Sequence, residues 1–426
     1  MEKENTITEY NFTGTSRLVL LIGMGLGVVC MILSFFLDGG VEHHARFWSN
    51  FLHNSVFFTG IALMATFFIA VCITAWAGWY TIFKRVWEAF SQFLIVGFIL
   101  MLIIGIGIYL HWHHLYHWAD QTILNPENEE VYDAILHGKS AFLNTTWYVI
   151  IGGLIVLVWV FFAYKLRALS LDEDQNGGDA NFSHHRSMRW YAAAFLPIAG
   201  FSSAAMIWLW IMSVDSHWYS TLFAWYTGAS WFVSMIALTI LVLVYLKNRG
   251  YFANVSAEHF HDLGKFMFAF SIFWTYLWFS QYMLIWYANV GEETTYFKQR
   301  IDHYPVLFYG NLIINFIVPF FVLMRNDTKR KYGTLVFVSI VLLLGHWWDF
   351  FLMLKPGILH TAHEAAGMTG EHGGFTPGFT IPGLLEIGTM LGFLSLFLFV
   401  AFSVLSRSSL VAKNDPFLEE SLHHHV

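Results

Sequence analysis

A histidine and an aspartate lie three residues apart in a strongly apolar stretch near the end of this chain. His346 and Asp349 interrupt the run LVFVSIVLLLGHWWDFFLML (335–354), which is long enough to cross a bilayer as a helix. Residues at this spacing share one helical face, so both side chains can act on one partner. A charged residue at the centre of a membrane helix costs roughly 2.5–3.5 kcal/mol on insertion scales, which predicts a functional site. We expect proton or ligand handling, and the alternative is a structural pair that joins this helix to its neighbours.

His346 and Asp349 are expected in the outer half of the membrane, given a rise of about 1.5 Å per helical residue. Other polar residues are expected at a similar depth or at the outer surface. The candidate proton-path residues are His346, Asp349, Asp215, His217, Gln281 and Glu386, with Asn311 and Asn315 as supporting groups. The amides could instead make interhelical hydrogen bonds, and Asp215 and His217 could simply mark a helix end. The inner half offers Glu88 and Gln92 as entry candidates and then mainly hydroxyl groups.

The composition predicts that membrane-spanning helices position these residues. Of the 426 residues, 57% are hydrophobic and only 12% are charged, whereas soluble proteins have about 25% charged residues. We predict an all-α polytopic protein with a single integral membrane domain, residues 1–426, and an inner C-terminal tail, residues 407–426. Ten spans are expected, at 18–37, 53–80, 89–110, 146–166, 189–213, 221–246, 265–288, 305–325, 333–354 and 382–406.

The distribution of basic residues predicts the orientation. With the N-terminus inside, 17 of the 22 Lys and Arg residues fall in inner segments and five in outer loops, as the positive-inside rule requires. Both termini are therefore expected in the cytoplasm. The net charge of −7 is spread over loops on both sides and does not suggest a nucleic-acid partner.

The cysteine and histidine residues limit the redox centres that this chain could hold. Two cysteines, both in apolar spans, exclude a covalently attached c-type haem and an iron–sulfur cluster held by four cysteines. A bis-histidine haem is not expected, because His53 lies nearer a helix end than His346. His113 and His117 have a helical metal-binding spacing, but no third ligand is evident and an interfacial role is favoured. The Gly- and His-rich segment 355–381 is expected to be an irregular outer loop.

Two sequence stretches carry a resemblance to a known family. The stretches FSQYMLIWYANVGEETTYFKQR (279–300) and WIMSVDSHWYST (210–221), with the ten-span layout, resemble the F subunit of bacterial alternative complex III. That complex is a quinol:cytochrome c or quinol:oxidase oxidoreductase, and its large membrane subunits belong to the polysulfide-reductase-type, NrfD-like family. The resemblance covers most of the chain and implies two four-helix bundles, spans two to five and six to nine, with two flanking helices. The residues that match the family's motif stretches are Asp215, Gln281, Glu292 and Glu293.

The resemblance also implies a function and partners. It implies a cofactor-free subunit of the bacterial cytoplasmic membrane, with a proton-conducting, supporting or quinone-related role. The implied partners are a homologous quinol-oxidising membrane subunit, a multihaem cytochrome c, an iron–sulfur subunit, a terminal oxidase and lipids. Haem c and iron–sulfur clusters would reside in those partners, and menaquinol or another quinol would be oxidised in the complex. The competing functions are a secondary transporter with an outer-half polar site and a purely structural scaffold.

Overall fold

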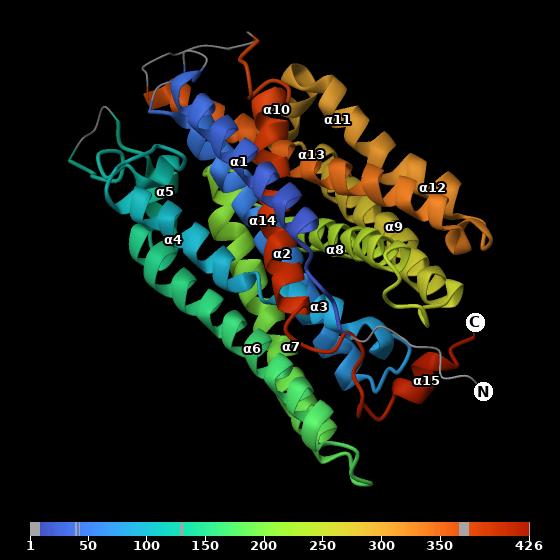
Figure 1. Cartoon of the computed structure of the whole chain (residues 1–426). Coiled ribbons are helices and arrows are strands. Elements are labelled where there is room, and N and C mark those ends of the chain that lie inside the picture. Colours follow the sequence, from blue (N-terminus) through green and yellow to red (C-terminus); the bar gives the residue numbers. More distant parts are fainter. Residues whose placement is uncertain (1–8, 39–40, 42, 128–130, 366–374, 426) are drawn as a thin grey trace.

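The chain folds into long helices that run side by side (Figure 1). The computed structural model describes residues 9–38, 41, 43–127, 131–365 and 375–425. Within these residues the regular structure is helical, apart from one isolated bridge between Glu9 and Ser409. The predicted all-α membrane class is confirmed.

Nine helical segments in the described part of the chain are long and apolar enough to cross a membrane. Several are interrupted by a turn or by a short 3-10 or π segment. The segments are α1 Gly14–Phe36; α2 Ala45–Thr74; Thr81–Tyr109, which contains α3 Lys84–Ser91 and α4 Leu94–Tyr109; Trp147–Asn176, which contains α6 Gly152–Asn176; Ser183–Val214, which contains α7 Ser183–Trp210; α8 Leu222–Asn248; Pro305–Leu323, which contains α11 Pro305–Leu312 and α12 Val318–Leu323; Tyr332–Glu364 in α13 Tyr332–Ala365; and α14 Leu384–Leu405.

The tenth expected span lies in a helix of a different character. Residues 265–288 form the second part of α9 (Ala257–Ala288), which at 32 residues is long enough to cross but is not among the nine apolar segments. Its middle carries Trp274, Thr275 and Tyr276, with Gln281 further on. These aromatic and polar side chains make the helix less apolar than the nine segments, so the expected count of ten is not exact.

The helices pack as two bundles and a flanking pair. The first bundle contains α2, α3–α4, α6 and α7, and the second contains α8, α9, α11–α12 and α13. Helices α2 and α8 lie at the centre, where 83% of the most apolar stretch of each is buried, against 22% for α1. Helix α1 packs mainly on α14, and Gly27 and Gly392 allow the close approach, because a Cβ on Gly27 would lie 2.4 Å from the Gly392 Cα.

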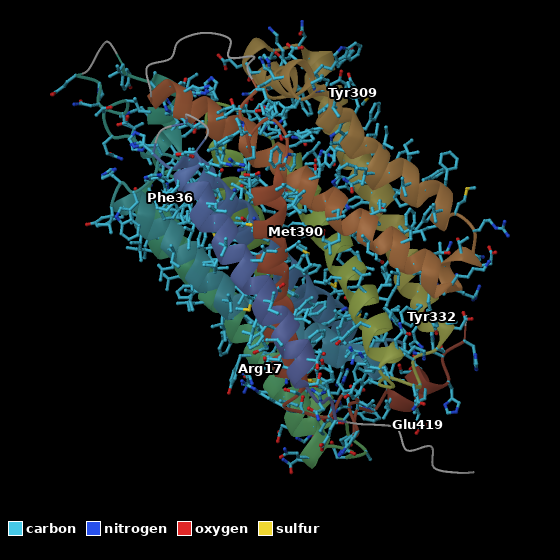
Figure 2. All side chains as sticks on the ribbon, turned by 45° about the horizontal axis from the view of Figure 1, so that its top comes forward. Arg17, Phe36, Tyr309, Tyr332, Met390 and Glu419 are labelled. Carbon is cyan, nitrogen blue, oxygen red and sulfur yellow. The ribbon has the colours of Figure 1, made fainter. Side chains whose placement is uncertain are left out.

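Successive long helices alternate in direction, so the chain has two distinct ends. The described chain begins next to Ser409 and ends beyond α15 (Leu418–Leu422), on one side that we call the termini side. Figure 2 places Arg17 and Glu419 towards that side, and Phe36 and Tyr309 towards the opposite one, the far side. The far side also carries α5 (Ala134–Lys139) and the amphipathic α10 (Gly291–His303).

The expectation of an irregular loop over residues 355–381 is partly wrong. Helix α13 continues through Pro356 and Gly357 to Ala365, and residues 366–374 lie outside the described part of the chain. Lys355 is therefore a buried helical residue and not a loop residue. The longer helix also moves Asp349 from the outer part of a short span to the middle of α13.

Candidate functional site

Asp349 is the centre of a polar cluster that joins four helices. From α13 its carboxylate reaches Tyr226 and Ser230 on α8, Trp274 on α9 and Asn311 on α11. The Tyr226 hydroxyl donates to Oδ1, and Asn311 Nδ2 donates to the same oxygen at 2.7 Å. Trp274 Nε1 donates to Oδ2 at 3.0 Å, and the Ser230 hydroxyl donates to it at 3.3 Å. We call these five residues, together with His346, the Asp349 cluster.

The donors around Asp349 are all neutral groups. Each can stabilise an ionised carboxylate through a hydrogen bond, but none supplies the opposite charge that a buried ion needs for full compensation. Tyr226 and Ser230 can also accept a hydrogen bond, so a protonated Asp349 has partners as well. The cluster therefore accommodates both protonation states without a change of fold.

Ser230 links Asp349 to the second predicted residue, His346. The Ser230 Oγ lies 2.9 Å from His346 Nδ1, and both side chains are buried. Ser230 has a single hydroxyl proton, which it can donate to Asp349 while it accepts one from the imidazole. The other ring nitrogen of His346, Nε2, is buried without a hydrogen-bond partner in the described part of the chain. The two predicted residues are thus connected through the Ser230 hydroxyl.

The predicted amides extend the cluster along one helix. Asn315 Nδ2 donates to Asn311 Oδ1 at 2.6 Å, one turn away from Asp349. Asn315 lies in a π-helical segment, η5 (Ile313–Ile317), and such bulges are frequent at functional sites. It packs against Gly345, where a Cβ would approach Asn315 Oδ1 to 2.3 Å. The geometry places both amides in this network, where they make hydrogen bonds to Asp349 and to each other.

A small cavity adjoins the carboxylate on the side of Gln281. Its volume is about 20 Å³, and its lining includes Asp349, Tyr226, Asn311, Gln281 and Arg300. A cavity needs about 10–15 Å³ to hold one water molecule. Gln281 Nε2 is buried without a partner among the described residues, so it is free to bind such a water. Gln281 therefore belongs to the site through the cavity and not through direct contact.

No protein-family model matches this chain, and no curated protein sequence matches it significantly.

Asp215 lies outside the Asp349 cluster and pairs with an arginine. It follows η4 (Met212–Val214), and its Oδ2 accepts from Arg300 Nη2 at 2.8 Å. Burial alone would lower the pKa of Arg300, but Asp215 and the neighbouring Tyr296 outweigh it and raise the pKa. Arg300 remains a fixed cation. Because it lines the small cavity, it stands between that cavity and Asp215.

A second, much larger cavity of about 1,430 Å³ opens beyond Asp215 on the far side. Histidine and acidic side chains are prominent in its lining, among them His114, His117, His217, His303, His360, Asp120, Asp133, Asp215 and Glu364. His217 contacts Asp133 there, and no hydrogen bond or ion pair among the described residues joins it to the Asp349 cluster. Burial would raise the pKa of Asp133, but the Leu136 N–H and the His217 imidazole hold it below its usual value.

Glu386 belongs to a separate buried cluster between α2, α13 and α14. Arg46 donates to both of its carboxylate oxygens, at 2.8 and 3.0 Å. Asn50 bridges Glu386 to Lys355, whose Nζ donates to Asn50 Oδ1 at 2.6 Å. With a bidentate arginine as its partner, Glu386 has the environment of a structural ion pair.

The remaining predicted residues lie outside the Asp349 cluster. Glu292 and Glu293 begin α10 on the far side. Glu88 is buried on the termini side and pairs with Arg85 at 2.6 Å, while Gln92 Nε2 donates to the Ala163 carbonyl at 3.4 Å. No hydrogen bond of the described residues links these two to His346 or Asp349, so the geometry does not assemble a path from the termini side.

The histidines considered as metal or haem ligands have other partners. His113 and His117 do not share a helix, because the chain turns after α4 and His113 Nε2 donates to the Ile104 carbonyl at 3.1 Å. His53 Nε2 donates to the Trp347 carbonyl at 2.9 Å. Within the described residues, no group of three His, Cys, Asp or Glu side chains could hold a metal ion.

Three members of the cluster, Tyr226, Ser230 and Trp274, were not predicted. Hydroxyl and indole groups are common in membrane helices, so each residue alone gives no signal. The spacing of Tyr226 and Ser230 does give a signal, because residues four apart share a helical face and can contact the same partner. Ser234, one turn further, continues that polar stripe along α8.

Proposed function

We propose that this chain is a cofactor-free membrane subunit of a respiratory quinol-oxidising complex and that Asp349 takes up and releases a proton. The observation that carries the proposal is a fully buried carboxylate in the middle of a membrane helix, held by neutral donors only. Keeping such a group in a membrane is costly, and proton relays are among the functions for which membrane proteins retain one.

The cavity beside Asp349 supports proton transfer in preference to quinone binding. Ligand pockets measure about 300–1,000 Å³, whereas this cavity has about 20 Å³. It suits a water molecule between Asp349 and Gln281. In the proposed role, Asp349 holds the proton, Ser230 relays it to or from His346, and Tyr226 and Asn311 fix the carboxylate.

The proposed setting follows from the resemblance to the alternative complex III subunit. The termini side would face the bacterial cytoplasm and the far side would face outward. The homologous quinol-oxidising subunit, the multihaem cytochrome c and the iron–sulfur subunit would supply the redox chemistry. The acidic and histidine-rich far-side cavity would then receive protons that leave the site.

Purification in a mild detergent tests the complex. We expect the chain to co-purify with a c-type cytochrome, visible in the haem spectrum, and with an iron–sulfur protein. A monodisperse chain without redox partners would contradict the respiratory assignment and favour the transporter.

Substitution of the carboxylate tests the proton role. Asp349→Asn retains the size and most hydrogen bonds but cannot ionise, so we expect at least a tenfold loss of quinol-driven proton release, with the complex still assembled. The exposed far-side acid Asp302 provides a matched control, and Asp302→Asn should keep the wild-type rate. Loss of assembly without a selective proton defect would instead indicate a structural scaffold.

A further inference from the structure

Arg300 is a fully buried cation between the two cavities. It lines the small cavity beside Asp349, and its ion-pair partner Asp215 lines the large far-side cavity. Tyr296, one turn earlier on α10, lines both cavities. The boundary between the buried carboxylate and the far-side cavity therefore contains these three residues.

Two residues of α13, Pro356 and Gly357, create the environment in which Arg300 is buried. Pro356 has no N–H, so the carbonyl of Leu352, four residues earlier, loses its usual helical partner. Arg300 Nε donates to this carbonyl at 3.0 Å. Gly357 completes the fit, because a Cβ there would lie 2.9 Å from Asp215 Oδ1. Pro356 thus leaves a free carbonyl for Arg300, and Gly357 leaves the space that Asp215 needs.

Aromatic stacking fixes the guanidinium further. The Arg300 guanidinium carbon lies 3.4 Å from the centre of the Tyr296 ring. The Trp218 ring stacks on Tyr296, with ring centres 4.0 Å apart and an angle of 14° between the planes. An arginine held by a carboxylate, three helix carbonyls and a stacked ring has little freedom to move aside.

We propose that Arg300 is a barrier residue that prevents protons from exchanging freely between Asp349 and the far-side cavity. The proposal rests on the proposed proton role of Asp349. A fixed positive charge in a narrow passage repels hydrated protons, as arginines do in selective channels. Release of a proton would require the Arg300–Asp215 pair to open, so the pair makes proton release conditional on a conformational change.

Exchange of the Trp274 indole proton with solvent tests the barrier. Trp274 Nε1–H contacts Asp349 directly, and its exchange after transfer to D₂O can be followed by NMR on full-length, ¹⁵N-tryptophan-labelled protein in its complex. Comparison with Trp274→Phe identifies the signal. We expect Arg300→Gln to accelerate this exchange at least tenfold, and Arg300→Lys, which keeps the charge, to accelerate it less.

The control is the exposed Lys298 on the same helix, since Lys298→Gln removes the same charge without opening the boundary. Its Trp274 exchange should match the wild type. Equal Trp274 exchange in Arg300→Gln and Lys298→Gln would overturn the proposal.

A second reporter separates a local opening from a damaged fold. Trp87 Nε1 donates to Thr239 at 2.9 Å in a buried region away from Arg300, so its exchange should stay slow. If Arg300→Gln accelerates the exchange of both indole protons, the variant Asp215→Asn provides the test, because it removes the ion-pair partner of Arg300. Unchanged Trp274 exchange in Asp215→Asn would then refute the barrier role of Arg300. The exchange measurement does not need quinol turnover. The barrier proposal can therefore fail while the Asp349→Asn test supports the proton role, and the proton role can fail while the exchange measurement supports the barrier.

Discussion

Asp349 differs from two other buried carboxylates of this protein in the charge of its partners. Glu386 receives two hydrogen bonds from Arg46, and Glu88 contacts Arg85. A nearby cation stabilises the ionised form of a carboxylate, so these two groups are held as anions. The neutral donors of Asp349 stabilise the anion less. Of the three, Asp349 is therefore the one suited to gain and lose a proton.

His113 provides a residue-scale prediction about pH. Burial lowers the pKa of its imidazole to about 4, against about 6.5 in an unfolded chain. Between these values the unfolded state binds more protons, so the folded state loses stability as the pH falls from about 6.5 to 4. The loss is on the order of 3 kcal/mol.

Thermal unfolding at pH 7.5, 5.5 and 4.5 checks this expectation. His113→Gln keeps a donor for the Ile104 carbonyl but does not titrate, so its unfolding temperature should fall less between these pH values. The exposed neighbour His111 serves as the control, and His111→Gln should follow the wild type. The same pH dependence in wild type and His113→Gln would exclude His113 as its source.

The predicted site residues that the structure brings together share one property. Asp349, His346, Asn311 and Asn315 are strongly polar groups inside apolar runs, where they have to find partners in neighbouring helices. Arg300 could not be found in this way, because it follows a polar stretch and looks like an ordinary loop residue. Its burial depends on the long-range approach of Asp215 and α13, which no local pattern encodes.

At the scale of the elements, the length of the apolar runs predicted the position of most helices. It did not predict helices with a more polar composition. Helix α10 is amphipathic and polar overall, and it was not expected as a helix. The end of α13 contains Pro356 and Gly357, which ordinarily end a helix. Tertiary contacts override that signal here, because Arg300 satisfies the freed Leu352 carbonyl.

The contact between α1 and α14 gives an element-scale prediction. At Gly27 a Cβ would meet the Gly392 backbone, which cannot move aside, so Gly27→Val should force the helices apart at a cost of roughly 1–3 kcal/mol. Disulfide formation between Cys30 and Gly388→Cys reports their separation, because a Cβ on Gly388 lies 3.3 Å from the Cys30 Cβ.

We expect Gly27→Val to slow this cross-link at least tenfold. Gly25→Val is the matched control, since nothing lies within 4 Å of a Cβ at Gly25. Rapid cross-linking in both variants would show that α1 tolerates the added side chain without leaving α14.

At the scale of the whole molecule, the C-terminal segment 413–425 connects the two bundles on the termini side. Asp415 pairs with the buried Lys84 of α3, in the first bundle. His424 Nε2 lies 2.7 Å from Asp262 Oδ2 of α9, in the second bundle. Between them, Ser421 Oγ donates to the Trp79 carbonyl at 2.9 Å. A segment that is polar in sequence thus contributes buried contacts to both halves of the protein.

Asp415→Asn tests this connection. Removing one partner of a buried ion pair typically costs 3–5 kcal/mol, and Glu173, 3.7 Å from Lys84, should limit the loss to the lower part of that range. Burial would raise the pKa of Asp415, but Lys84 holds it below its usual value. Its contribution is therefore present above about pH 4 and lost as the pH falls further.

The unfolding temperature of Asp415→Asn should accordingly lie below that of the wild type at pH 7, and the two should converge below about pH 4. Glu419 is exposed in the same segment, so Glu419→Gln should change stability by no more than about 0.5 kcal/mol. Equal unfolding temperatures for Asp415→Asn and the wild type at pH 7 would mean that the two bundles hold together without this pair. In that case the central packing of α2 and α8 would have to supply the stability of the bundle interface.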